Sequence, residues 1–211
     1  MKKLIAGLIA GLMLLGVVGC KLEFNTEKTI QTNHIVMPDG KILISDFDAM
    51  TIRNFLKATE EVKDYHILLN TGGGNAPNAI TMINRIQNLQ RQGAHITTET
   101  YGYALSAGAV VFLTGDTRII HSGAMLMFHC SRVSSFGGVQ TQKTEDMEEP
   151  MRDWLIMIDN NFAELLKEKT NLTDEEIDRW LFHEDSNFMS AEEAFKIKIA
   201  TILVKDNNDN G

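Results

Sequence analysis

Cysteine, proline and aromatic residues are all scarce in this chain. Of its 211 residues, two are cysteine, three are proline and 7% are aromatic. If Cys20 carries a lipid, Cys130 has no partner for an internal disulfide, so stability must come from a hydrophobic core. The hydrophobic fraction of 44% and the charged fraction of 23% are ordinary for one globular domain, and the length leaves no room for a second.

Clustered positive charge is also missing. The formal charge is −8, and lysine and arginine form no cluster outside the extreme N-terminus. A phosphate-binding surface therefore has little support, and we expect no nucleic-acid partner. No segment has the spacing G-x-x-x-x-G-K-[ST], which argues against a nucleotide site, and we assign the chain no cofactor and no metal.

Residues 1–19 have the pattern of a secretory signal. Two lysines precede an uncharged run from Leu4 to Val18, which is rich in leucine, alanine and glycine and is short for a membrane-spanning helix. The run leads into Val17-Val18-Gly19-Cys20, which resembles the bacterial lipobox, where small residues precede a cysteine that is lipidated after cleavage. Cys20 would then be the new N-terminus and the lipid anchor; the alternative is an uncleaved anchor helix.

In either case we expect an exported chain that is held at a membrane of the cell envelope. By resemblance to known sorting signals, Lys21 favours the outer membrane if the host has one. Residues 20–33 are polar and lack periodicity, as expected of a tether, and residues 205–211 form a polar tail that we predict to be disordered. Residues 34–204 remain as the folded domain.

The pattern of apolar residues predicts an α/β domain. Short strand-like runs lie at 35–37, 41–44, 67–69, 95–100, 118–120 and 125–128, with helices at about 46–62 and 80–93 and a small apolar segment at 104–113. A long helix is predicted at 147–169, with Pro150 in its first turn, and capping boxes begin two more helices at Thr173 and Ser190. Two successive β-α units imply a mainly parallel sheet with right-handed crossovers.

Ser106 lies between a predicted strand and a helix, in the small-residue segment Gly102-Tyr103-Ala104-Leu105-Ser106-Ala107-Gly108-Ala109. At a helix N-terminus the unpaired N–H groups favour developing negative charge, and small neighbours let a substrate backbone approach. A serine that merely caps the helix is the alternative, and the segment taken alone favours it.

Two further features could belong to the same site. Gly72-Gly73-Gly74 directly follows a buried strand, and such glycines can expose backbone N–H groups for an oxyanion hole, although a plain turn fits equally. His129 follows the apolar run Met125–Phe128 and can act as a general base, although a lone histidine there is more often structural. His121 is the competing histidine, placed just before a predicted surface turn.

Together these segments resemble the ClpP-like family of serine peptidases over about residues 65–195. Residues 69–74 are similar to the family's strand ending in N-S-P-G-G, residues 102–109 to G-x-A-x-S-x-G-A, residues 127–129 to M-I-H, and residues 188–194 to F-[LM]-S-A-x-E-A. The resemblance implies a ClpP/crotonase-like fold of repeated β-β-α units with C-terminal helices. It also implies Ser106 as the nucleophile, His129 as the base, and the N–H groups of Gly73 and Ala107 as the oxyanion hole.

The family's catalytic aspartate lies shortly before the F-[LM]-S-A segment. Aligning Ile177-Asp178-Arg179 with the family's I-E-R-D puts Trp180 at that place, but the stretch that follows is about two residues longer here. Glu184-Asp185 resembles the acidic pair of phage-type members. By this resemblance we choose Asp185 as the acid, with Glu184 and Asp178 as alternatives.

The resemblance implies a serine endopeptidase that binds an extended peptide as an added strand near the glycine turn. Because an exported protein has no ATP-driven unfoldase, we expect short or already unfolded peptides as substrates. The first alternative is a catalytically inactive oligomeric scaffold or peptide-binding lipoprotein. The second is a crotonase-like acyl-CoA enzyme, but the pair Ser106 and His129 and the lack of a basic patch for the CoA phosphates argue against it. The family implies rings of six or seven subunits, and the many apolar residues of helix 147–169 are compatible with such contacts.

Overall fold

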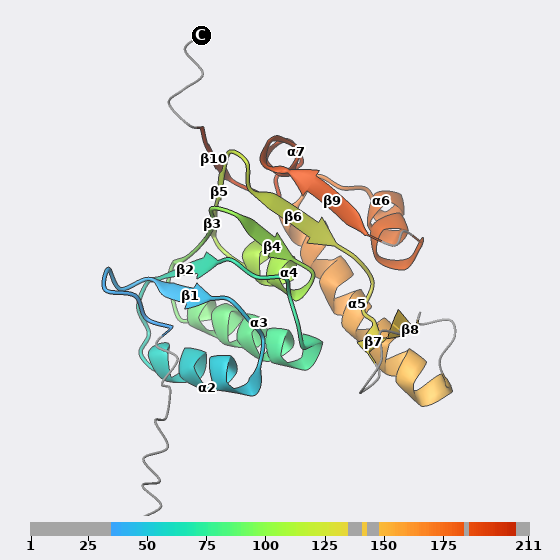
Figure 1. The fold of residues 1–211 in the computed structure, drawn as a ribbon, viewed down its shortest axis with the longest axis horizontal. Coiled ribbons are helices and arrows are strands. Elements are labelled where there is room, and N and C mark those ends of the chain that lie inside the picture. Colours follow the sequence, from blue (N-terminus) through green and yellow to red (C-terminus); the bar gives the residue numbers. More distant parts are fainter. Residues whose placement is uncertain (1–34, 135–140, 143–147, 184–185, 206–211) are drawn as a thin grey trace, which may run out of the picture. The chain divides into compact units, whose positions relative to one another are not determined.

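The computed structural model describes residues 35–134, 141–142, 148–183 and 186–205 (Figure 1). Its larger sheet has five parallel strands in the order β1 (Ile42–Ile44), β2 (Tyr65–Leu69), β3 (Ile96–Thr100), β5 (Thr117–His121) and β10 (Ile202–Val204). A second sheet joins β4 (Tyr103–Leu105) in parallel to β6 (Met125–Phe128), which pairs antiparallel with β9 (Asn187–Ser190). β7 (Val133–Ser134) and β8 (Thr141–Gln142) form a separate antiparallel pair.

The helices connect and cover these strands. They are α2 (Ala49–Ala58), α3 (Ala76–Arg91), α4 (Ala107–Leu113), α5 (Glu149–Lys169), α6 (Asp174–Asp178), the π-helical turn η2 (Arg179–His183) and α7 (Ala191–Lys196). α2 and α3 lie side by side, and α4 packs between α3 and α5 (Figure 1). The parallel sheet and the alternation of strands and helices confirm the predicted α/β fold class.

The hydrophobic core lies between the larger sheet and its helices. Every residue of α4 is buried, because this short helix is apolar on all sides and has neighbours all round. α3 contributes a narrower face, on which Met82, Ile86 and Leu89 are fully buried at helical spacing. The central position of α4 holds the turn that precedes it in one place.

The predicted helix boundaries were partly right. Pro150 does lie in the first turn of α5, and both predicted capping boxes are present, at Thr173 and Ser190. The helix predicted to reach residue 62 ends instead at Ala58, because the N–H and hydroxyl of Thr59 both bond to the carbonyl oxygen of Phe55 and close the last turn.

The first two strand-like runs pair with each other across a turn. Val36 and Ile42 form an antiparallel bridge, flanked by hydrogen bonds from Met37 N–H to Lys41 O (2.8 Å) and from Leu43 N–H to Ile35 O (2.7 Å), and β1 also pairs in parallel with β2.

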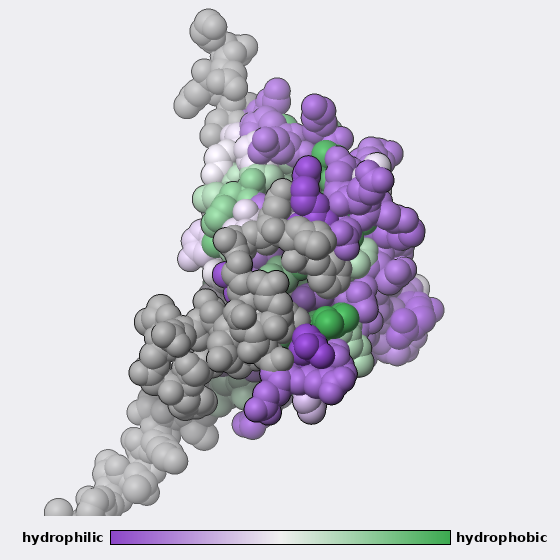
Figure 2. All heavy atoms as spheres, turned by 90° about the vertical axis from the view of Figure 1, so that its right-hand side faces the viewer, coloured by the Kyte–Doolittle hydropathy of each residue, from purple (hydrophilic) through white to green (hydrophobic). Residues whose placement is uncertain are grey.

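Seen from the right-hand side of Figure 1, the surface is mainly hydrophilic, and hydrophobic residues reach it in small areas only (Figure 2). Among the residues that the structure describes, no helix has the length and apolar character needed to cross a membrane.

Arg118 fastens β5 to the C-terminal elements. Its side chain is buried and donates hydrogen bonds to four backbone carbonyl oxygens, those of Gly115 (2.9 Å), Lys169 (3.3 Å), Lys198 (2.9 Å) and Ile199 (2.7 Å). A guanidinium group can serve several carbonyls at once because it carries five N–H donors in one plane. The end of α5 and the segment after α7 are therefore held to the main sheet by one side chain.

We predict that Arg118→Met lowers the free energy of unfolding by about 2–4 kcal/mol, because it leaves buried carbonyl groups without donors. Urea unfolding followed by circular dichroism measures this change. Arg91→Met, at an exposed position in the last turn of α3, is the matched control and should stay near the wild type. Equal stability of the two variants would contradict the assigned role of Arg118.

Candidate active site

Ser106 occupies the sharp turn between β4 and α4. Its backbone has φ 55° and ψ −124°, a conformation that residues other than glycine rarely adopt. The N–H of Ser106 donates to the carbonyl oxygen of Met127 (2.7 Å), which holds the turn against β6. Its hydroxyl makes no capping bond to α4, so the capping interpretation of this serine is not supported. A strained serine between a strand and a helix is the arrangement by which hydrolases expose a nucleophile.

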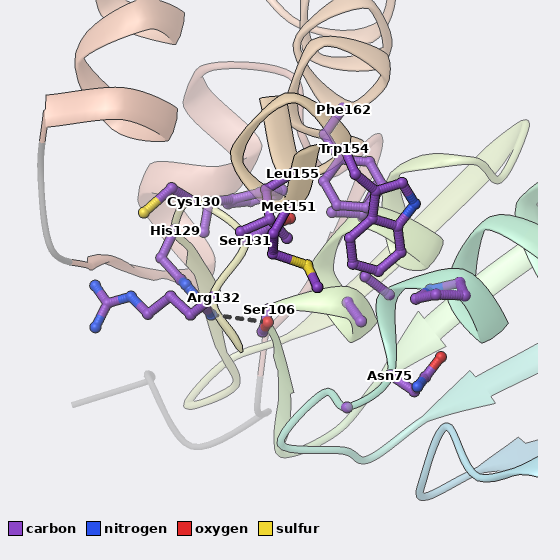
Figure 3. A pocket seen from close by; sticks show the side chains of 16 residues that line it. Asn75, Ser106, His129, Cys130, Ser131, Arg132, Met151, Trp154, Leu155 and Phe162 are labelled. Carbon is purple, nitrogen blue, oxygen red and sulfur yellow. Dashed lines mark hydrogen bonds between the residues drawn. The ribbon is translucent and has the colours of Figure 1, made fainter. Parts of the chain in front are cut away.

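His129 meets the hydroxyl of Ser106 directly. The distance between His129 Nε2 and Ser106 Oγ is 2.8 Å (Figure 3). The two residues meet because β4 and β6 are parallel neighbours in the register Leu105 to Met127, so both chains leave the sheet at the same edge. This is the contact that a general base needs with the nucleophile that it activates.

The environment of His129 keeps its imidazole neutral. Burial lowers the pKa of this histidine below its usual 6.5, and the positive charge of Arg132 acts in the same direction, while the backbone at Cys130 opposes them. A neutral imidazole at pH 7 can accept the proton of Ser106. The other ring nitrogen, Nδ1, is buried and has no hydrogen-bond partner.

The glycine turn lies against the Ser106 turn. Thr71 pairs with Ala104 in a parallel bridge, with Thr71 N–H bonded to Tyr103 O and Leu105 N–H bonded to Thr71 O, both at 3.0 Å. A Cβ atom placed on Gly73 would lie 2.7 Å from Ser106 Cβ, and the φ of Gly73 is +96°. Only glycine satisfies both conditions, so the close approach of the two segments depends on Gly73.

The two predicted oxyanion donors, Gly73 and Ala107, differ in whether their N–H groups are already hydrogen-bonded. A Cβ on Gly73 would lie 3.2 Å from the amide nitrogen of Ala107, so the two predicted residues are neighbours. However, the N–H of Gly73 donates to the hydroxyl of Thr71 (3.1 Å). Within the described part of the chain, the N–H groups of Ala107 and Gly74 donate no hydrogen bond. Gly74 is thus a second candidate for the donor from the glycine turn.

A cavity of about 530 Å³ opens beside the Ser106 and His129 pair. One side is formed by the glycine turn and the start of α3, and the rest by α4, β6, the segment that follows β6, and α5 (Figure 3). Its apolar wall consists of Val110, Phe128, Met151, Trp154, Leu155 and Phe162. The size and lining suit an apolar side chain next to a reactive hydroxyl.

The competing histidine has a different partner. His121 ends β5, and its Nε2 lies 2.8 Å from the buried carboxylate of Glu99, which also accepts a hydrogen bond from Lys41 (3.1 Å). Burial would raise the pKa of Glu99, but the hydrogen bonds from His121, Lys41 and Tyr101 outweigh it and hold this pKa at about 2. His121 therefore belongs to a charge cluster on the sheet, and His129 is the histidine beside the serine.

The described part of the chain shows none of the predicted acids beside His129. Asp185 and Glu184 lie outside the described residues, so their prediction stays open. Asp178 is exposed on α6 and does not line the cavity. No group of three or more histidine, cysteine or acidic side chains in the described ranges could hold a metal ion.

The sequence comparison agrees with this geometry. A sequence model of the Clp protease family matches residues 28–206. The chain belongs to the Clp protease family. The predicted family is thereby confirmed, and Clp protease membership implies a serine peptidase. The family also carries the general expectation of peptide substrates and of assembly from several copies.

The sequence prediction overlooked one residue beside this site. Asp159 is fully buried in α5, and its Oδ1 accepts a hydrogen bond from the backbone N–H of Ser131 (2.9 Å). It sits one helical turn from Leu155 and from Phe162, both of which line the cavity. An acid on the apolar face of a predicted helix is the signal that would have revealed it.

We predict that Gly73→Ala slows the reaction of Ser106 with a fluorophosphonate probe by about 100-fold, because the added methyl group displaces the serine turn. The rate of labelling, followed by mass spectrometry, measures the effect. Gly72→Ala is the matched control, because a Cβ on Gly72 meets no atom within 4 Å. If both variants label at the wild-type rate, the close contact does not hold the site together.

Proposed function

We propose that this protein is a serine endopeptidase that is attached to the cell envelope through a lipid on Cys20 and cleaves short or unfolded peptides without ATP. The peptidase part rests on one observation above all, the 2.8 Å contact between His129 Nε2 and Ser106 Oγ beside the apolar cavity. A nucleophile and a neutral base at this distance are the minimum that acyl transfer requires.

The mechanism follows from that pair. His129 takes the proton of Ser106 as Oγ attacks the scissile carbonyl carbon, and the oxygen of the tetrahedral intermediate receives hydrogen bonds from the N–H of Ala107 and from the glycine turn. Either Gly73, after releasing Thr71, or Gly74 supplies the second bond. His129 then gives the proton to the leaving amine, and a water molecule, activated by the same histidine, hydrolyses the acyl-enzyme.

The cavity indicates which peptides fit. Its apolar wall favours a large apolar side chain immediately before the scissile bond, and Met151 and Trp154 are partly exposed at this wall. An extended peptide can add as a strand near the glycine turn, where the backbone of Gly74 is exposed. A folded protein cannot offer its chain in this form, which agrees with substrates that are short or already unfolded.

The location is supported by the sequence of the first residues. Two lysines, an uncharged run and the lipobox-like segment ending in Cys20 are consistent with export and lipidation, and Lys21 favours the outer membrane where one exists.

Assembly into rings of six or seven copies is supported by the family and by α5. On this helix the relative exposures of Trp154, Ile156 and Met157 lie between 37% and 56%.

We predict that a fluorophosphonate probe labels the wild-type protein and that Ser106→Ala and His129→Ala abolish labelling. Ser45→Ala and His95→Ala, both at exposed positions, are the matched controls and should label normally. The wild-type rate should rise with pH and level off, with a midpoint below 6.5, because burial lowers the pKa of His129 and the base works when it is neutral. A folded wild type that does not react would support the inactive scaffold instead.

We predict that Cys20→Ser prevents lipid attachment and releases the protein from membranes. Metabolic labelling with a palmitate analogue, together with separation of membrane and soluble fractions, measures both effects in the bacterial host. Cys130→Ser is the control and should remain labelled and membrane-bound. Membrane association that persists in Cys20→Ser without any lipid would favour the uncleaved anchor helix.

A further inference from the structure

Asp159 is a buried acid to which neither the family resemblance nor the mechanism above gives a role. Its relative exposure is 0%, and it lies on α5 between two residues of the cavity wall, Leu155 and Phe162. An ionised carboxylate is costly to bury unless hydrogen bonds or opposite charges compensate for the lost water. Its contacts therefore need an explanation.

One of the two carboxylate oxygens of Asp159 has no hydrogen-bond partner. Oδ1 accepts the N–H of Ser131, but Oδ2 is buried and accepts no hydrogen bond. His129, two residues before Ser131, has the complementary deficit, because its Nδ1 is buried and unpartnered. An imidazole that has taken a proton at Nε2 carries a donor at Nδ1, and a carboxylate oxygen is the acceptor that such a donor prefers.

A raised pKa of Asp159 accompanies this placement. Burial raises the pKa of Asp159 to about 6, although hydrogen bonds from Ser131 oppose the rise. Because the folded pKa lies above the usual 3.8, the contribution of this group to stability is fully present below pH 3.8 and is lost as the pH rises through about 6. At neutral pH the carboxylate is thus ionised at the expense of stability, as is typical of functional sites.

Few other charges face Asp159. Its neighbours one turn away on α5 are apolar, and α4, which packs against α5, has no titratable residue. α6 also packs on α5, and its acids, Asp174, Glu175, Glu176 and Asp178, are exposed or partly exposed. The titratable residues on the segment bonded to Asp159 are His129, Cys130 and Arg132.

We propose that Asp159 is the acidic partner of His129. Its carboxylate holds the segment of residues 129–131 against α5 through the Ser131 amide, and its negative charge stabilises the imidazolium that forms when His129 takes the proton of Ser106. Asp159 is a positioning residue, because it acts through His129 and not on the substrate. This inference rests on the proposed peptidase function, and it assigns the acid to α5 and not to Asp185.

Asp159→Asn tests the proposal, because asparagine keeps an oxygen for the Ser131 N–H and removes the charge. We expect kcat for an unfolded peptide substrate to fall by about 10³- to 10⁴-fold with little change in KM. The acidic limb of kcat/KM should move to lower pH. Asp153→Asn, an exposed position on the same helix, is the matched control, and circular dichroism in urea verifies that each variant is folded.

Three results would overturn the proposal. The first is a kcat of Asp159→Asn within about twofold of wild type, which is within the range of a neutral surface change. The second is a lower kcat with an unmoved acidic limb, which would mean that Asp159 is structural only. The third is an acidic limb that moves in Asp185→Asn but not in Asp159→Asn, which would return the role to Asp185.

A second measurement does not depend on catalysis. The ring nitrogens of His129 can be titrated by NMR in the Ser106→Ala protein, with and without Asp159→Asn. We expect the midpoint to fall by about one pH unit when the negative charge is removed. If no peptide is cleaved but the midpoint moves, the proposed function fails and the pairing of Asp159 with His129 stands. If peptides are cleaved and the midpoint stays, the pairing fails alone.

Discussion

The contact between His129 Nε2 and Ser106 Oγ depends on the parallel pairing of β4 with β6. Each strand belongs to a different β-α unit, so neither residue is near the other until the second sheet has formed. The bond from Ser106 N–H to Met127 O then locks the turn, and the Thr71 bridge brings the glycine turn against it. The buried helix α4 holds this arrangement from behind, which is how the strained backbone of Ser106 is maintained.

The pKa values of two buried carboxylates in this protein, Glu99 and Asp159, are shifted in opposite directions. Glu99 receives hydrogen bonds from His121 and Lys41, and they keep its pKa at about 2, so it is ionised at neutral pH. Asp159 receives hydrogen bonds from the side chain and the backbone of Ser131, but its Oδ2 has no partner, and burial raises its pKa to about 6. The contrast shows that partners, more than burial itself, decide whether an acid acts as a fixed charge or as a group that responds to pH.

The parts of the fold that follow from local patterns could be predicted from the sequence. Alternating apolar runs and glycine turns predicted the parallel sheet, and the capping boxes at Thr173 and Ser190 marked the starts of two helices. The site residues needed more, because Ser106 and His129 are 23 positions apart and each has an ordinary structural interpretation when taken alone. Their shared resemblance to one family made the pair recognisable.

What the sequence could not predict depends on tertiary contacts. The bonds of Thr59 end α2 early, and β1 pairs in parallel with β2 as well as antiparallel with the run before it. Asp159 was overlooked because one acid among apolar residues looks incidental until the loop that it holds is known. Likewise, His121 was predicted to lie just before a surface turn, and nothing in the sequence indicated its bond to Glu99, which is 22 residues away in the chain and on the neighbouring strand.

The proposed function requires Ser106 to be a working nucleophile, served by His129 and facing an oxyanion hole. A crystal structure of the protein with a bound peptide boronate tests this requirement. We expect a tetrahedral boron bonded to Ser106 Oγ, one boronate oxygen bonded to the N–H of Ala107 and to a glycine-turn N–H, and the adjoining side chain in the apolar cavity. A boronate that binds without a bond to Ser106, or with its oxygen away from both amides, would contradict it.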